Sequence, residues 1–84
     1  MDQQEDIRRA LLRKLAKHGW WGGRHTSFDN LPKGFPRHLA KEVKDLAKDM
    51  IKTGILLAKP TNYGLEISLN PNKKREIEEI VGNG

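Results

Sequence analysis

The stretch PRHLAKEVKDLAKDMIKTG, residues 36–54, has the periodicity of a long helix with one apolar and one basic face. Its apolar residues recur every three or four positions, at Leu39, Val43, Leu46 and Met50. At 100° per residue, the basic residues fall within an arc of about 80° on the opposite side. This arc, the cationic ridge, consists of Arg37, Lys41, Lys44, Lys48 and Lys52. Along one flank run the acidic residues Glu42, Asp45 and Asp49. We therefore expect a helix that is anchored by one face and offers the other to a polyanion.

The composition indicates one basic domain over residues 1–84. The chain has no cysteine, which excludes disulfides and thiolate-bound zinc and is typical of a reducing, cytoplasmic location. No apolar stretch approaches the roughly 18 residues that cross a bilayer, so we expect no membrane partner. The net charge of +5 and the pI near 9.8 suit a protein whose partner is an anion such as nucleic acid.

Helical periodicity also marks both ends of the chain. Ile7, Leu11 and Leu15 recur at every fourth position and predict a helix over residues 3–17, which Gly19 ends. Asn70 followed by Pro71 has the form of an N-cap and a first-turn proline, so a closing helix is expected to reach about residue 81.

Strand-like segments at residues 55–59 and 65–69 follow the long helix. In the second segment Leu65, Ile67 and Leu69 alternate with polar residues and are expected to face inward. Residues 60–64 are predicted to form the loop of a hairpin, with Pro60 ending the first strand.

Residues 26–29, ahead of the long helix, have the spacing of a helix cap. Thr26 is the expected capping residue, with Asp29 three positions later. The helix that follows is short, because Pro32 disfavours helical backbone angles at Leu31.

This order of helix, short helix, turn, long helix, hairpin and helix resembles the winged helix-turn-helix family of DNA-binding domains. The resemblance covers residues 7–69, and its most specific part is LAKDMIKTGIL at residues 46–56, where a recognition helix runs into the first strand of a wing. It implies an α+β fold with a three-helix core, a two-stranded β-hairpin wing and a C-terminal helix. It also implies a transcriptional regulator or a small chromosomal protein that binds double-stranded DNA.

The resemblance places the recognition helix, at about residues 36–53, in the major groove with its N-terminal residues nearest the bases. Carried onto this sequence, the groove-side residues are Arg37, His38, Lys41 and Lys44. The wing, residues 59–64, touches the DNA backbone through Lys59, Thr61 and Asn62. A helix of about 24 Å is longer than one groove crossing, so Lys48 and Lys52 are left out of the site.

Residues in the loops have two readings each. Arg24 and Lys33, on either side of the short helix, are candidate phosphate contacts, and ordinary loop exposure explains them as well. Tyr63 at the hairpin tip either stacks on nucleic acid or packs on its own hairpin, and we favour packing. For Trp20 and Trp21 we favour closure of the core over stacking on bases.

The sequence predicts no enzyme, no cofactor and no metal site. His18, His25 and His38 lack the spacing of a ligand pair, and no serine or threonine stands in a nucleophile-and-base pattern. Two other functions stay open: a protein-docking module of a larger assembly, and binding of structured RNA. We favour a monomer over a homodimer, with the apolar edge of the closing helix folded back onto Ile7 and Leu11.

Overall fold

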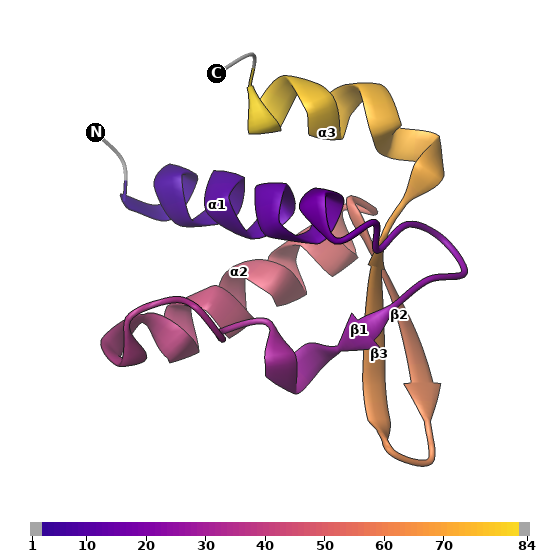
Figure 1. Cartoon of the computed structure of the whole chain (residues 1–84), viewed down its shortest axis with the longest axis horizontal. Helices are drawn as coiled ribbons and strands as arrows, with labels where there is room; N and C mark the ends of the chain where they lie inside the picture. The colour runs from indigo at the N-terminus through magenta and orange to yellow at the C-terminus, as the bar shows by residue number, and fades with distance from the viewer. Residues whose placement is uncertain (1–2, 83–84) are drawn as a thin grey trace.

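A computed structural model describes residues 3–82 of the chain as an α+β fold, compatible with the winged-helix arrangement, in which helices pack against one side of a small sheet (Figure 1). Three α-helices, three strands and three single turns of 3-10 helix make up this part of the chain. Along the sequence they are α1 (Gln3–Lys17), β1 (Thr26–Ser27), η1 (Phe28–Asn30), η2 (Arg37–Leu39), α2 (Ala40–Lys52), β2 (Leu56–Thr61), β3 (Gly64–Leu69), η3 (Pro71–Lys73) and α3 (Lys74–Val81). The strands are antiparallel in the order β1-β3-β2.

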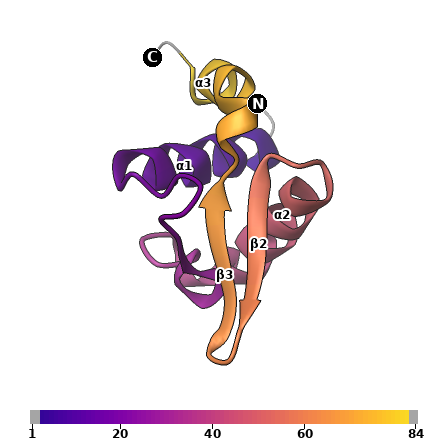
Figure 2. The same ribbon diagram turned by 90° about the vertical axis from the view of Figure 1, so that its right-hand side faces the viewer.

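The hairpin of β2 and β3 projects from the body of the molecule, and its turn is the part farthest from α3 (Figure 2). Its strands are longer than predicted, because β2 continues through Pro60 to Thr61. Pro60 therefore does not end the strand. A proline is tolerated there because β2 is an edge strand, which pairs only with β3. Gly64 has a φ of 125°, so glycine is suited to the point where the chain enters β3.

The segment between α1 and η1 contains the third strand, which the sequence pattern did not reveal. Gly19 ends α1 with a φ of 72°. The backbone N–H of Leu69 then donates to the carbonyl of Trp20 (2.7 Å), and that of Gly22 donates to the carbonyl of Leu69 (3.0 Å). Farther on, β1 pairs with the middle of β3, with Thr26 opposite Ile67. The loop after α1, which contains Trp20, Trp21 and Gly22, thus extends the sheet.

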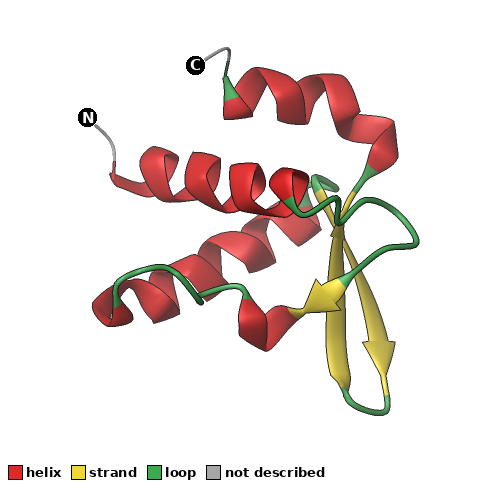
Figure 3. Ribbon diagram, in the orientation of Figure 1, coloured by secondary structure: helices red, strands yellow, loops and turns green. Residues whose placement is uncertain are grey.

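The short second helix of the core is the single turn η1, and a loop joins it to η2 (Figure 3). Ser27 rather than Thr26 caps this turn, since the Ser27 hydroxyl accepts a hydrogen bond from the backbone N–H of Asp29 (3.2 Å). Leu31 keeps helical angles (φ −60°, ψ −40°) although a proline follows, which contradicts the expected effect of Pro32. The gain is the burial of the Leu31 side chain in the core.

The core lies between α1, α2 and the inner face of the sheet. Its completely enclosed side chains include Leu11, Leu12, Leu15, Leu31, Val43, Leu56, Ile67 and Leu69. Trp20 and Trp21 pack against this core, as predicted.

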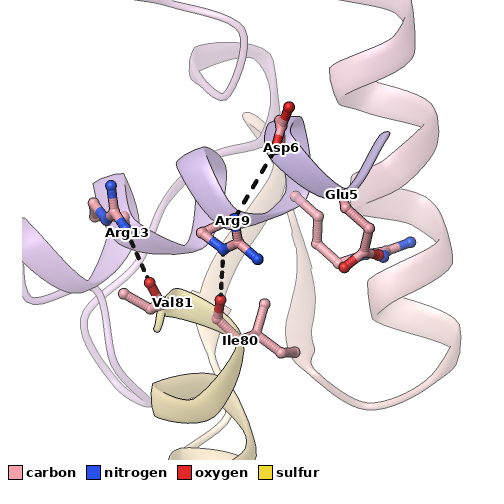
Figure 4. A network of polar contacts seen from close by, with 7 residues as sticks. Glu5, Asp6, Arg9, Arg13, Ile80 and Val81 are labelled. Carbon is pink, nitrogen blue, oxygen red and sulfur yellow. Dashed lines mark hydrogen bonds and ion pairs between the residues drawn. The ribbon is translucent and has the colours of Figure 1, made fainter. Parts of the chain in front are cut away.

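The terminal helix α3 packs on α1, where Ile77 is buried and Ile80 and Val81 are partly buried. Two arginines of α1 hold its last turn: Arg9 Nε donates to the carbonyl of Ile80 (3.0 Å) and Arg13 Nη2 to that of Val81 (2.9 Å) (Figure 4). The closing helix therefore folds back onto α1.

Candidate nucleic-acid interface

The cationic ridge lies on the side of α2 that faces away from the core. Val43, Leu46, Ala47 and Met50 form the buried side of α2. The terminal helix lies over α1 and leaves the opposite side of α2 open (Figures 1 and 2). Arg37 and His38, both exposed, belong to the 3-10 turn η2 that leads into α2. The ridge is thus exposed except at Lys44, which is partly covered.

Lys41 of the ridge pairs with an acid on its own helix. Its ammonium Nζ donates to Oδ2 of Asp45, one turn farther on, at 2.9 Å. The side chain of Lys41 remains 89% exposed. The hydrogen bond from Lys41 lowers the pKa of the Asp45 carboxyl below its ordinary value, and the positive charges of Lys41 and Lys48 lower that pKa further.

Lys44 connects α2 to η1. Its Nζ donates to Oδ1 of Asp29 at 3.4 Å and lies 5.9 Å from the centre of the Phe28 ring. The side chain of Lys44 is consequently less exposed, at 38%. Lys44 therefore contacts η1, in addition to its predicted contact with DNA.

The other three cations of the ridge differ from Lys41 and Lys44 in their ion pairing. Within residues 3–82, no ion pair joins Arg37, Lys48 or Lys52 to an acidic side chain. Lys48 and Lys52, which we had left out of the site, are exposed cations in line with Lys44.

Negative charge gathers on one flank of α2. A hollow of about 390 Å³ beside the start of α1 is lined by Glu42, Asp45 and Asp49, together with His38 and Lys41. Carboxylates repel phosphates, so this flank disfavours a polyanion, and the other flank, toward Lys44, carries the exposed carboxylate of Asp29.

Lys14 of α1 is a positioning residue that the sequence did not point out. Its Nζ donates to the carbonyls of Asn30 and Leu31 (3.3 Å each) and to that of Lys33. Burial lowers the pKa of Lys14, and the charge of Lys33 lowers it further. Through these carbonyls Lys14 holds the loop between η1 and η2, which leads into α2.

The predicted loop contacts lie apart from one another. Arg24 precedes β1, at the sheet edge opposite β2, and its side chain is exposed. The structure therefore does not bring Arg24 next to the hairpin strand that follows α2. Lys33 is exposed in the loop ahead of η2, closer along the chain to the start of the ridge.

The hairpin combines predicted site residues with structural ones. Lys59 is exposed on β2 opposite Glu66, whose carboxylate lies 2.9 Å from Nδ1 of His25. Thr61 shapes the turn: its hydroxyl donates to the carbonyl of Gly64 (2.7 Å) and accepts from the N–H of Tyr63 (3.1 Å).

The tip of the turn is open to solvent. Asn62 is exposed, and Tyr63 is 96% exposed, so the Tyr63 ring does not pack on its own hairpin. The packing that we favoured for Tyr63 is therefore wrong.

No group of three or more histidine, cysteine, aspartate or glutamate side chains within residues 3–82 is arranged to hold a metal ion. In the same range no helix is long and apolar enough to cross a membrane. Comparison with known proteins finds no matching family model, no similar curated protein and no similar solved structure.

Proposed function

We propose that this chain is a winged-helix domain that binds double-stranded DNA, as a transcriptional regulator or a small chromosomal protein. The observation that carries the proposal is the largely exposed cationic ridge of α2 leading directly into a projecting hairpin. The strand order β1-β3-β2, with β1 between the first helix and the turn η1, supports it. DNA binding fits the cytoplasmic location expected from the cysteine-free sequence.

In the proposed complex the N-terminal end of the long helix enters the major groove. Arg37, His38, Lys41 and Lys44 face the duplex, with Arg37 able to make a bidentate contact to guanine. The acidic flank of α2, which His38 and Lys41 border, lies at the edge of this contact. Lys59 and Asn62 of the hairpin reach the backbone beside the groove. Lys33 extends this surface, whereas Arg24 lies toward the other sheet edge and is at most a peripheral contact.

The ion pairs on the ridge do not prevent this contact. Exposed pairs such as Lys41–Asp45 contribute little to stability, because water screens the charges. A phosphate offers each ammonium an equivalent acceptor together with the release of counterions. With a single arginine on the ridge, backbone contacts supply most of the affinity and sequence specificity is modest.

The test is a titration of the protein against duplex DNA at several salt concentrations, with RNA and single-stranded DNA as competitors. If roughly four to six phosphates are contacted, log K falls against log salt with a slope of about −4 to −5. Lys41→Ala combined with Lys44→Ala is expected to weaken binding to all sequences and to flatten the slope by about two units. The matched control, Lys74→Ala with Arg75→Ala, removes the same charge from exposed positions at the start of α3 and should leave the slope nearly unchanged.

Single substitutions test which end of the long helix enters the major groove. Arg37→Ala is expected to cost roughly 1–3 kcal/mol, chiefly on a preferred site. Lys48→Ala should have a smaller effect than Lys41→Ala, and equal losses at the two positions would contradict insertion of the N-terminal end. Absence of duplex binding at low salt would rule out the DNA function. Tighter binding of RNA than of duplex DNA would indicate an RNA-binding function instead.

Protein docking is the second candidate. The mixed charge of α2 favours it, since Asp45 and Asp29 already pair with two of the five ridge cations. In either case we expect a monomer, because the apolar edge of α3 is used against α1.

A further inference from the structure

Tyr63 is the one aromatic residue in the described chain whose ring is open to solvent. Trp20, Trp21, Phe28 and Phe35 all pack against the core, whereas Tyr63 is 96% exposed. Leaving a ring in water forgoes the stabilisation that its burial would give. Asn62 and Tyr63 form the turn between β2 and β3. Figure 2 shows that this hairpin projects from the body of the molecule.

The backbone that carries this ring is held in place. The connection between β2 and β3 consists of Asn62 and Tyr63, with Thr61 paired to Gly64 on the two strands. The Thr61 hydroxyl bridges the turn, since it accepts from the N–H of Tyr63 (3.1 Å) and donates to the carbonyl of Gly64 (2.7 Å). The tip therefore presents Tyr63 from a fixed turn, which lowers the entropic cost of using the ring in binding.

The charges around the tip suit a nucleic acid. Residues 59–65 contain one charged side chain, Lys59, and no acid. The nearest carboxylate along β3, that of Glu66, lies 2.9 Å from His25 Nδ1. A phosphate backbone can thus approach the tip without meeting a negative charge on this turn, and Lys59 attracts it.

To bind by stacking, the Tyr63 ring needs a planar partner with an exposed face. In a continuous duplex the faces of the bases are covered by their neighbours, and opening a step costs a few kcal/mol. Where the duplex ends in a single-stranded extension, the face of an unpaired base is available without that cost.

We propose that Tyr63 stacks on an unpaired base where a duplex meets a single strand, while the cationic ridge holds the adjoining duplex. The proposal rests on the DNA-binding function above and names the preferred ligand, a duplex with a single-stranded junction rather than a continuous duplex. Tyr63 supplies this preference, and the lysines supply the charge-dependent part of the affinity.

The test compares binding of a continuous duplex with binding of the same duplex carrying a short single-stranded overhang. The first unpaired base is 2-aminopurine, whose fluorescence reports stacking. We expect the wild-type chain to favour the junction and to change the probe's fluorescence. Tyr63→Ala should weaken junction binding by about 5- to 150-fold, the loss of one stacked base. The slope of log K against log salt should stay the same, because no charge is removed.

Three variants separate stacking from other roles of the tip. Tyr63→Phe keeps the ring and should keep the preference for the junction, whereas Tyr63→Leu keeps apolar bulk and should lose it. Asn72→Ala, a control at an exposed, uncharged residue outside the proposed contacts, should keep it. Because Tyr63 and Asn72 are exposed, thermal unfolding of all three should match the wild type.

The outcomes separate the two proposals. Wild-type binding without preference for the junction, or a preference that Tyr63→Ala or Tyr63→Leu leaves unchanged, overturns the stacking role and leaves the DNA function standing. Absence of wild-type binding to either DNA overturns both.

Discussion

Two segments of this chain carry the same charge and use it in opposite ways. Residues 1–20 and residues 36–54 each contain five basic and three acidic residues, a net charge of +2. On α1, Arg9, Arg13 and Lys14 donate to backbone carbonyls of other segments, and Arg8 pairs with Glu5. On the ridge of α2, Lys41 and Lys44 form ion pairs, whereas Arg37, Lys48 and Lys52 are exposed and form no ion pair within residues 3–82.

The difference shows that the number of cations does not identify a binding surface. A cation bound to carbonyls within the chain holds the fold together and is occupied, whereas a cation left in water is available to an anionic partner. The comparison predicts that equal losses of charge from the two segments have different consequences. The predictions below test this division from the largest expected effect to the smallest.

The contact between α1 and α3 should be structural throughout. Ile77→Ala empties a site that is 1% exposed, so we expect a loss of about 2–5 kcal/mol in the free energy of unfolding, measured with urea. The protein that remains folded should bind DNA with unchanged affinity. A loss under about 1 kcal/mol would mean that α3 is only loosely attached to α1.

Two double variants with the same loss of charge test the division directly. Arg9→Ala with Arg13→Ala removes the donors to the Ile80 and Val81 carbonyls and should cost about 1–2 kcal/mol of stability, because water partly replaces both hydrogen bonds. Its salt slope for DNA binding should change little. Lys41→Ala with Lys44→Ala should cost less than about 1 kcal/mol and should flatten the slope instead. If log K fell against log salt with equal slopes for the two double variants, α1 and α2 would not differ in how they use their cations.

The smallest effect concerns the Asp45 carboxyl. In the folded chain the hydrogen bond from Lys41 lowers its pKa, so the carboxylate form stabilises the fold above the ordinary pKa of aspartate. That contribution disappears as the pH falls through the lowered value. In an NMR titration we expect Asp45 to titrate below its usual range, and Lys41→Ala should raise its pKa. Bound DNA should also raise it, if Lys41 turns from Asp45 to a phosphate.

The sequence predicted the elements whose periodicity is strong. The apolar spacing of Ile7, Leu11 and Leu15 gave the bounds of α1, and the two faces of α2 are as expected. The start of α2 was less accurate, since Arg37 to Leu39 form a 3-10 turn. The hairpin was expected, although its strands are longer than its turn chemistry indicated.

What the sequence could not predict depends on contacts between distant segments. The strand β1 has two residues, too few for any alternation, and exists because β3 offers it partners. Lys14 was one lysine among several on α1, and its role becomes visible only when the carbonyls of residues 30–33 are in place. The exposure of Tyr63 likewise depends on how far the hairpin projects.

The junction around Asn70 is one more contact between distant segments. Its backbone N–H donates to the carbonyl of Ile55 (3.1 Å), its side-chain Nδ2 donates to that of Gly54 (2.8 Å), and its Oδ1 accepts from the N–H of Asn72 (3.0 Å). Asn70 thus joins the end of α2, the base of the hairpin and the beginning of η3 through its backbone and its side chain.

Because the hydrogen bonds of Asn70 connect these segments, the long helix and the hairpin are held at one spacing. A duplex that contacts both elements has to match this spacing. DNA whose groove is too wide or too narrow must be bent or twisted to fit. Under the proposed DNA-binding function, we expect the stiffness of the DNA, more than the identity of its bases, to decide where the protein binds.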